Sequence, residues 1–261
     1  MPSGSVVFDR AAHYYDDTRG FPPGEEQHVA ELISRVGGWN MDSRVLEIAI
    51  GTGRIALPLS RHVRAIYGVD LSRPMMERLR AKQSSEPIWL AESDITRLPF
   101  KSGSLDGAVA VHVFHLVPDW QGALREVARV LRPGAVLVHA GNGKTPAYEG
   151  LSAAINAELP SYEQSVLSVF DREDDHFLID TGWRRVGNMQ FYEFSYYEAP
   201  QRFLDTYEKR MWSHTWRLSD EELAKAVSAL RDAIRSQFGD PHEAIKLTTN
   251  FRAAAYLPPT H

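Results

Sequence analysis

The stretch Val45-Leu46-Glu47-Ile48-Ala49-Ile50-Gly51-Thr52-Gly53-Arg54 decides the fold of this chain. An apolar run that holds one acid leads into two closely spaced glycines and then into a sequence that suits a helix. This order predicts a buried parallel strand, a tight turn and a helix start. Glycine tolerates positive φ and close approach of a ligand, and the free N–H groups of a helix start face whatever lies over the turn. The stretch therefore predicts a site for a nucleotide-like cofactor.

The glycine spacing alone fits two kinds of cofactor. Gly51-x-Gly53-x-x-Ala56 satisfies the dinucleotide fingerprint, and Asp70, 19 positions after Gly51 (70 − 51), stands where an acid would bind a ribose. Glu47 favours a different ligand, because a carboxylate at the strand end repels a pyrophosphate and attracts an ammonium or a sulfonium. An NAD-dependent oxidoreductase that uses this turn remains the main alternative.

With the segments that follow it, the stretch resembles the class I S-adenosylmethionine-dependent methyltransferases that act on small molecules. The first motif of that family is a strand, an acid and three alternating glycines. Glu47, Gly51 and Gly53 match it, whereas Ala49 replaces the first glycine and is expected to keep a negative φ. The matching motifs cover roughly residues 43–141 in the family's order and spacing. The other matching segments are 65–72, 91–100, 104–112 and 124–135.

The resemblance implies a set of contacts to S-adenosylmethionine, whose product after transfer is S-adenosylhomocysteine. Asp70 would bind the ribose hydroxyls, Asp94 the adenine amino group and Glu47 the ammonium. An N-terminal arm would fold over the cofactor, with Tyr14 against the methionine part and Arg19 paired with its carboxylate. The further cofactor contacts expected are Ala49, Gly51, Gly53, Leu71, Met75, Ile95 and Val111.

The histidine-rich segment after the fourth strand is the candidate catalytic region. His115 is the first candidate for a general base and His112 the second, because a neutral imidazole takes a proton near pH 7. A buried structural histidine is the alternative for each, and in-line displacement from a sulfonium can proceed without a base. We expect a methyl acceptor that is a small organic molecule, methylated on O or N. Candidate acceptor contacts are Tyr15, Phe114, Tyr207, Arg210, Trp212 and His214, of which the last four equally fit a purely structural aromatic cluster.

Strands and helices alternate from Glu25 to about Ala140, which predicts an α/β fold with a doubly wound, mostly parallel sheet. The resemblance implies a Rossmann-like sheet of seven strands, with the last strand antiparallel and a helical cap. We expect an arm over residues 1–24 that is largely irregular, a cofactor-binding core over 25–142, and cap segments plus two final strands over 143–261. The acidic run at 171–176 is expected to be a solvated helix start within a helical stretch at 146–182.

The composition excludes several classes of function. The 261 residues carry a net charge of −5 with no dense Lys/Arg run, which argues against a nucleic-acid partner. The chain has no cysteine, so disulfides, thiolate metal sites and cysteine nucleophiles are excluded. No His/Asp cluster has metal-ligand spacing, and no apolar run approaches the roughly 20 residues of a membrane-spanning helix. We expect a cytoplasmic enzyme without a metal or a membrane partner and of undefined oligomeric state; a non-catalytic S-adenosylmethionine-binding protein is the second alternative.

Overall fold

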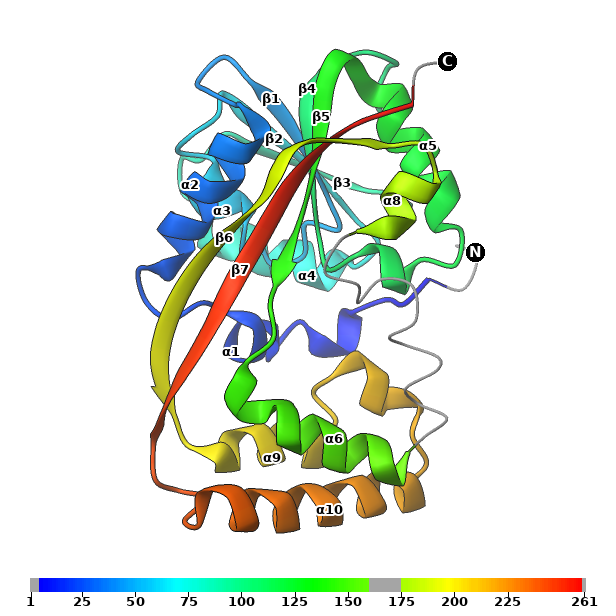
Figure 1. Cartoon of the computed structure of the whole chain (residues 1–261). Helices are drawn as coiled ribbons and strands as arrows, with labels where there is room; N and C mark the ends of the chain where they lie inside the picture. The colour runs from blue at the N-terminus through cyan, green and yellow to red at the C-terminus, as the bar shows by residue number, and fades with distance from the viewer. Residues whose placement is uncertain (1–4, 160–174, 260–261) are drawn as a thin grey trace. The chain divides into compact units, whose positions relative to one another are not determined.

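The structure is a computed structural model that describes residues 5–159 and 175–259. The chain forms two compact units (Figure 1). Unit 1 comprises Met1–Gly141, Arg172–Tyr192 and Phe251–His261, and unit 2 comprises Asn142–Asp171 and Glu193–Asn250. Two long strands, β6 (Arg184–Glu198) and β7 (Ile245–Leu257), contribute residues to both units.

One seven-stranded sheet organises the chain. Its first five strands are β1 (Arg44–Ile48), β2 (Ala65–Asp70), β3 (Ile88–Glu92), β4 (Leu105–Val111) and β5 (Leu131–Asn142). The strand order is β3-β2-β1-β4-β5-β7-β6, and β1 to β5 pair in parallel. Strand β7 runs against its neighbours (Figure 1). The doubly wound sheet with an inserted antiparallel strand confirms the predicted fold class.

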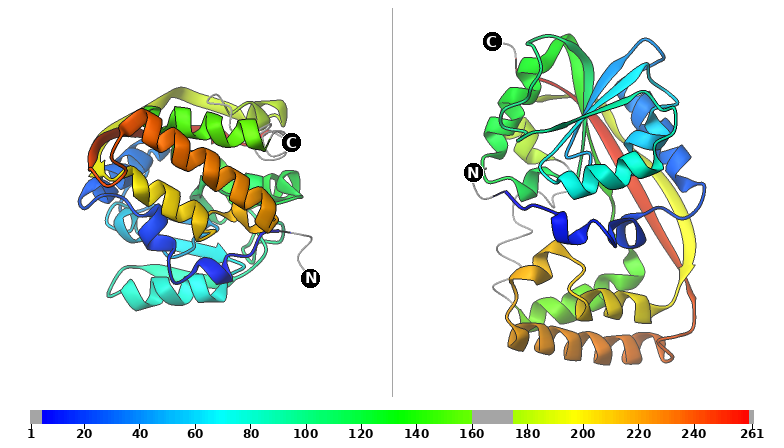
Figure 2. Two further views of the ribbon diagram at one scale, coloured as in Figure 1. Left: turned by 90° about the horizontal axis from the view of Figure 1, so that it is seen from below. Right: turned by 180° about the vertical axis from the view of Figure 1, so that it is seen from behind.

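The inner parallel strands are buried on both faces. Val45, Leu46 and Ile48 of β1 are at most 1% exposed, because helices cover the sheet from both sides. Helices α2 and α5 lie on opposite sides of β1 and β4 (Figures 1 and 2). The helices of unit 1 after the arm are α2 (Glu25–Gly37), α3 (Ala56–Leu59), α4 (Arg73–Lys82), the 3-10 turn η2 (Phe114–Leu116), α5 (Trp120–Val130) and α8 (His176–Asp180).

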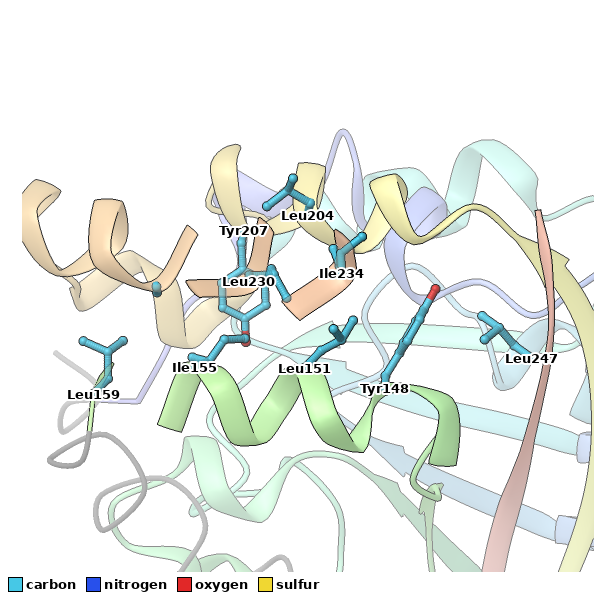
Figure 3. Close-up of a cluster of buried hydrophobic side chains, with 10 residues drawn as sticks. Tyr148, Leu151, Ile155, Leu159, Leu204, Tyr207, Leu230, Ile234 and Leu247 are labelled. Atoms are coloured by element: carbon cyan, nitrogen blue, oxygen red, sulfur yellow. The ribbon is translucent and has the colours of Figure 1, made fainter. Parts of the chain in front are cut away.

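Unit 2 has its own apolar core. It contains η3 (Pro146–Tyr148), α6 (Glu149–Glu158), α9 (Pro200–Glu208), η4 (Ser213–Arg217) and α10 (Asp220–Phe238). Helix α10 begins at a capping box, in which Ser219 and Glu222 each accept the other's backbone N–H. Figure 3 shows the cluster that these helices enclose with β7: Tyr148, Leu151, Ile155, Leu159, Leu204, Tyr207, Ala226, Leu230, Ile234 and Leu247.

The arm contains two short elements, the 3-10 turn η1 (Asp9–Ala11) and the helix α1 (Tyr15–Arg19). In the helical stretch expected at 146–182, the described residues form η3, α6 and α8. Residues 160–174, which include Asp171, Glu173 and Asp174 of the acidic run, lie outside the described part. In the part of the chain that the structure describes, no helix is long and apolar enough to cross a membrane.

Candidate functional site

The turn after β1 is built from left-handed backbone. Gly51 and Gly53 have φ of 54° and 79°, as their sequence positions suggest, but Ala49 also has a positive φ of 55°. The expectation that Ala49 keeps a negative φ was therefore wrong. The backbone adopts the left-handed conformation at this position although no glycine is present. This conformation costs an L-residue roughly 1–2 kcal/mol.

Close packing explains the second glycine of the turn. A Cβ on Gly53 would lie 2.6 Å from the Leu79 Cγ of helix α4, so only glycine lets α4 approach the turn. A Cβ on Gly51 would meet the Met75 Cε at 3.3 Å. Met75 is thus packed beneath the turn and is 2% exposed, and its contact with a cofactor stays a prediction.

Asp70 ends β2 beside this turn. Its Oδ2 accepts the backbone N–H of Gly51 at 2.8 Å, and its Oδ1 accepts that of Ser72 at 2.8 Å. Burial raises the pKa of Asp70, while these N–H bonds oppose the rise. Each carboxylate oxygen can accept a further hydrogen bond, so the pair of oxygens suits a ribose diol.

Glu47 is a buried acid with an incomplete set of partners. Its side chain is 4% exposed, and its Oε2 has no hydrogen-bond partner among the described residues. Burial raises the pKa of Glu47 well above its usual range; the charge of Arg54 lowers it in part, and Asp70 raises it further. A buried carboxylate in this position is stabilised by a ligand that brings a positive charge and N–H donors.

The N-terminal arm is fastened to the turn and to α4. Asp16 accepts from the Thr52 hydroxyl at 2.5 Å and from the Lys82 ammonium at 2.7 Å. Asp9 accepts from the Ser72 hydroxyl at 2.6 Å, next to Asp70. These contacts place the arm over the glycine turn within unit 1. The sequence did not reveal the two aspartates, because isolated acids in a loop carry no spacing signal.

Arg54 links the arm to Glu47. Its guanidinium donates to the carbonyl oxygen of Arg19 at 2.9 Å and lies 4.7 Å from the ring centroid of Phe21. Burial lowers the pKa of Arg54, and the nearby Tyr15, Glu47 and Asp16 raise it. The Tyr14 hydroxyl is buried without a hydrogen-bond partner in the described part of the chain.

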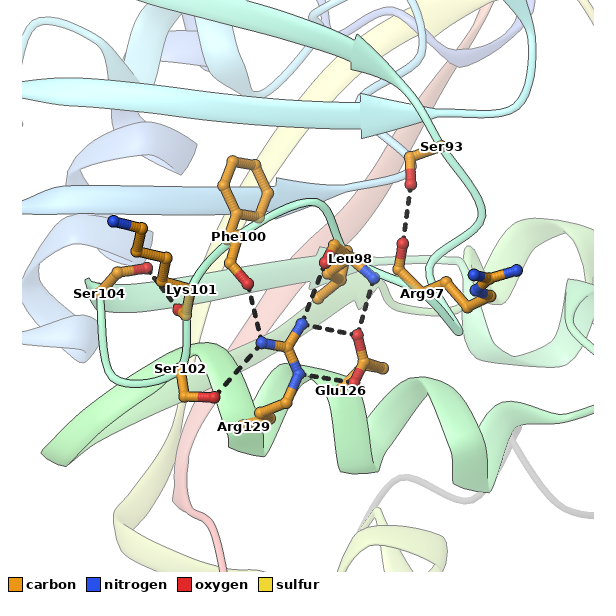
Figure 4. Close-up of polar contacts among 9 residues, drawn as sticks. All are labelled: Ser93, Arg97, Leu98, Phe100, Lys101, Ser102, Ser104, Glu126 and Arg129. Carbon is orange, nitrogen blue, oxygen red and sulfur yellow. Dashed lines mark hydrogen bonds and ion pairs between the residues drawn. The ribbon is translucent and has the colours of Figure 1, made fainter.

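The segment after β3 carries Asp94 and is braced by helix α5 (Figure 4). Asp94 Oδ1 accepts from the backbone N–H and the hydroxyl of Thr96, at 2.9 and 2.8 Å. Arg129 donates to the carbonyl oxygens of Leu98 and Phe100 at 3.0 and 2.7 Å. Its partner Glu126 also accepts the N–H of Leu98 at 2.8 Å, so the Arg129–Glu126 pair fixes this segment beside Asp94.

The two candidate bases follow β4. His112 has a positive φ of 52°, and a Cβ on Gly141 of β5 would lie 3.0 Å from its Cε1, so its ring packs against that strand. His115 follows Phe114, which is 1% exposed. Burial and the charges of Arg19 and His139 together lower the pKa of His115 to about 4. His115 is therefore neutral near pH 7 and resists protonation.

The candidate acceptor contacts after β6 all lie in unit 2. The Tyr207 hydroxyl and His214 Nε2 are 3.1 Å apart, and Trp212 Nε1 donates to Thr206 Oγ1 at 2.6 Å. Arg210 donates to the carbonyl oxygens of Thr215 and Leu218, at 2.7 and 2.6 Å. It also pairs with the Asp220 carboxylate at 2.7 Å. These bonds give the cluster a structural role within unit 2, and its contact with an acceptor stays a prediction.

The prediction of a solvated helix start was right about the helix and wrong about the solvation of Asp175. Asp175 directly precedes α8, but it is 2% exposed and has a φ of 52°. Its carboxylate accepts from the Tyr256 hydroxyl at 2.8 Å and lies 3.0 Å from His139 Nδ1 and 3.4 Å from Arg252. Three partners far away in the sequence make this burial possible, and a local run of acids gives no sign of them.

Comparison with known proteins agrees with this geometry. A family model described as a methyltransferase domain matches residues 46–139, from β1 to β5. Residues 46–139 form a methyltransferase domain of the class I S-adenosylmethionine-dependent family. The chain is 31% identical to a 2-phytyl-1,4-naphtoquinone methyltransferase of Nostoc punctiforme over 137 residues. This alignment covers 49% of this chain and 60% of that protein. The chain is 34% identical to a phosphatidylethanolamine N-methyltransferase of Cereibacter sphaeroides over 130 residues. This alignment covers 47% of this chain and 61% of that protein.

These matches thus span only about 60% of the length of the two curated relatives. The fold likeness extends further along the chain. The solved structure of the YcgJ protein from Bacillus subtilis aligns with a TM-score of 0.57 at 18% identity, covering 90% of this chain and 99% of that one. At this identity the likeness concerns the fold alone.

The residues of this methyltransferase site fit the family's cofactor, S-adenosylmethionine. Glu47 Oε2 and the Tyr14 hydroxyl are buried polar atoms without partners in the described part of the chain. The methionine end of the cofactor carries an ammonium, which suits Glu47, and a carboxylate, which suits a hydrogen-bond donor such as the Tyr14 hydroxyl. Asp70 stands at the strand end where a ribose binds in folds of this kind. No group of three His, Cys, Asp or Glu side chains suited to a metal ion occurs among the described residues.

Proposed function

We propose that this methyltransferase moves the methyl group of S-adenosylmethionine to an O or N atom of a small organic acceptor in one in-line displacement. Glu47 carries the proposal. A carboxylate that is 4% exposed, with one oxygen unpartnered among the described residues, fits the ammonium of this cofactor and opposes the pyrophosphate of a dinucleotide. This observation favours the methyltransferase over an NAD-dependent oxidoreductase.

The cofactor supplies a methyl group already activated by a sulfonium, so the protein's main task is to hold both reactants in line. Glu47 would fix the ammonium, Asp70 the ribose and Asp94 the adenine amino group. The arm, fastened by Asp16 to Thr52 and Lys82, would exclude water from the glycine turn. Arg19 follows in the same arm and would pair with the methionine carboxylate.

The choice of acceptors to test comes from the curated relatives. By their names, the two curated relatives act on a naphthoquinone and on the amine of a phospholipid. A screen should therefore include a reduced naphthoquinone, phosphatidylethanolamine, simple phenols and simple amines. Transfer to oxygen or nitrogen would support the proposal, whereas transfer to a ring carbon would contradict the O or N assignment.

The first experiment is titration calorimetry with S-adenosylmethionine, S-adenosylhomocysteine and NADH. We expect both adenosyl ligands to bind and NADH to give no heat. Asp70→Ala removes charge-assisted bonds to the ribose of roughly 1.5–3 kcal/mol and should weaken binding about 10- to 1,000-fold. Asp42→Ala, which removes an exposed acid before β1, is the matched control and should bind as the wild type does.

The acceptor screen is read by mass spectrometry of S-adenosylhomocysteine and of the methylated product. Binding of NADH with no heat from the adenosyl ligands would replace the proposal with the oxidoreductase. Binding of S-adenosylmethionine without transfer to any acceptor in the screen would favour a non-catalytic cofactor-binding protein.

A further inference from the structure

A carboxylate and an imidazole face each other at the carboxyl half of β5, and the methyl-transfer proposal does not use them. Asp175 Oδ2 lies 3.0 Å from His139 Nδ1, and the two side chains are 1% and 11% exposed. Asp175 is held from its other sides, by the Tyr256 hydroxyl at 2.8 Å and by Arg252 at 3.4 Å. A carboxylate at Nδ1 fixes the imidazole tautomer, with the proton on Nδ1 and a lone pair on Nε2.

Aromatic rings hold the imidazole in place. The ring centroid of His139 lies 5.3 Å from that of Phe177 and 5.9 Å from that of Phe114. The Nδ1 side of the ring is occupied by Asp175, the side chain is 11% exposed, and no hydrogen bond to Nε2 is found among the described residues.

The pair lies beside the carboxyl end of β4. His139 is in register with Ala110, and the next pair in the ladder is Ala140 with Val111, the last residue of β4. The chain continues from there through His112 to Phe114, whose ring contacts that of His139. The reacting groups are expected at this edge of the sheet, because ligands in open α/β sheets bind outside the carboxyl ends of the strands.

His115 is the obvious base in this neighbourhood, but its environment opposes the charge that a base must acquire. Burial and the positive charges of Arg19 and His139 lower the pKa of His115 to about 4. His139 has a different arrangement, because the Asp175 carboxylate lies 3.0 Å from its Nδ1 and orients the ring. Burial alone would raise the pKa of Asp175, but His139, Arg252 and Tyr256 hold it below its usual value, so the carboxylate is charged at neutral pH.

We propose that His139, oriented by Asp175, accepts the proton that the methyl acceptor loses. This inference rests on the proposed methyl transfer. A lone pair of the acceptor's O–H or N–H group forms the new bond to the methyl carbon, and the carbon–sulfur bond breaks with its electron pair going to sulfur. The acceptor proton goes to His139 Nε2. The resulting imidazolium is stabilised by the Asp175 carboxylate and later returns the proton to water.

Several charged or titratable groups of the described residues lie around this pair. They are Asp175 ahead of α8, Arg252 and Tyr256 on β7, and His115 on η2, while Arg185 of β6 acts on Tyr256. Replacing Asp175 with asparagine removes the carboxylate that orients His139 through Nδ1, so kcat should fall in Asp175→Asn.

The test compares wild type, His139→Gln, Asp175→Asn and His115→Gln, with the exposed His242→Gln in unit 2 as the matched control. An acceptor from the screen above is used for rates, and titration calorimetry gives the affinity for S-adenosylmethionine. We expect His139→Gln to lower kcat by about 10²- to 10⁴-fold, the usual contribution of a general base, with cofactor affinity unchanged. His242→Gln should match the wild type. NMR of ¹⁵N-histidine-labelled protein should show the neutral His139 protonated on Nδ1, and Asp175→Asn should weaken that preference.

Three outcomes would overturn the proposal. They are a wild-type kcat in His139→Gln, a neutral His139 protonated on Nε2, or a large loss of kcat in His115→Gln alone. A lower Tm in His139→Gln and Asp175→Asn without any change in kcat or its pH profile would make the pair a structural anchor for α8. Failure of the proposed function is distinguishable, because it appears in the wild type as absent cofactor binding or absent transfer.

Discussion

Replacing Ala49 with glycine should stabilise this protein, although glycine usually destabilises. Ala49 has a φ of 55°, a left-handed conformation that costs an L-residue roughly 1–2 kcal/mol. Glycine removes that cost but loses about 0.5–1 kcal/mol more in backbone entropy on folding. The difference predicts a gain of about 0.5–1 kcal/mol in the free energy of unfolding for Ala49→Gly. For a chain of this length, such a gain corresponds to a rise in Tm of about 1–4 °C.

The matched control is the same substitution at a right-handed position. Ala128 lies inside helix α5, where Ala→Gly should lower stability by about 0.5–1 kcal/mol. Both variants and the wild type are measured by urea unfolding and by thermal scans without cofactor. A loss of stability in Ala49→Gly as large as that in Ala128→Gly would refute the left-handed assignment. It would also restore the expectation that this position keeps a negative φ.

Other predictions concern charged groups and hydrogen bonds near the cofactor site. Because burial raises the pKa of Glu47, ionising this acid destabilises the folded protein, and this cost grows as pH rises from the unfolded-state pKa to the folded-state pKa. Glu47→Gln should therefore raise the Tm of the cofactor-free protein at pH 8 while weakening S-adenosylmethionine binding; equal Tm values at pH 8 would contradict the burial argument. Arg129→Ala leaves the carbonyl oxygens of Leu98 and Phe100 without a donor and should cost about 1–2 kcal/mol in urea unfolding, with only partial recovery in Arg129→Lys. Lys82→Ala removes an exposed ion pair with Asp16 and should change stability by less than about 1 kcal/mol, so a larger loss would show that this ion pair fastens the arm.

The sequence predicted the parallel half of the fold well, for a physical reason. A strand such as β1, buried on both faces, must be apolar throughout, and its turn and helix start must carry glycines and caps. Ser72, a residue type that favours the N-cap position, caps α4 and accepts the Met75 N–H at 3.3 Å. The alternation along β7 is also visible, since Leu247, Phe251 and Ala253 face the core. These features depend on residues that are neighbours in the sequence, so they can be predicted from the sequence.

The site was less predictable wherever it depends on distant contacts. Asp175 is buried because Tyr256 and Arg252 from β7 and His139 from β5 converge on it, and no local pattern signals this convergence. The prediction of a negative φ for Ala49 failed for another reason. Its side chain suggested ordinary backbone, but the turn geometry is imposed by the flanking strand and by the bond from Gly51 to Asp70.

Several unfavourable features lie together at the glycine turn, and they suggest how the site works. Within a few residues the chain holds a left-handed alanine and a buried carboxylate with one oxygen unpartnered among the described residues, and Arg54 offsets the charge of that carboxylate only in part. Arg54 also donates to the carbonyl of Arg19, so the group that stabilises Glu47 is the one that positions the arm. A ligand ammonium at Glu47 would relieve the same charge. Cofactor binding and the placement of the arm must then be energetically coupled, because both act through the charge on Glu47.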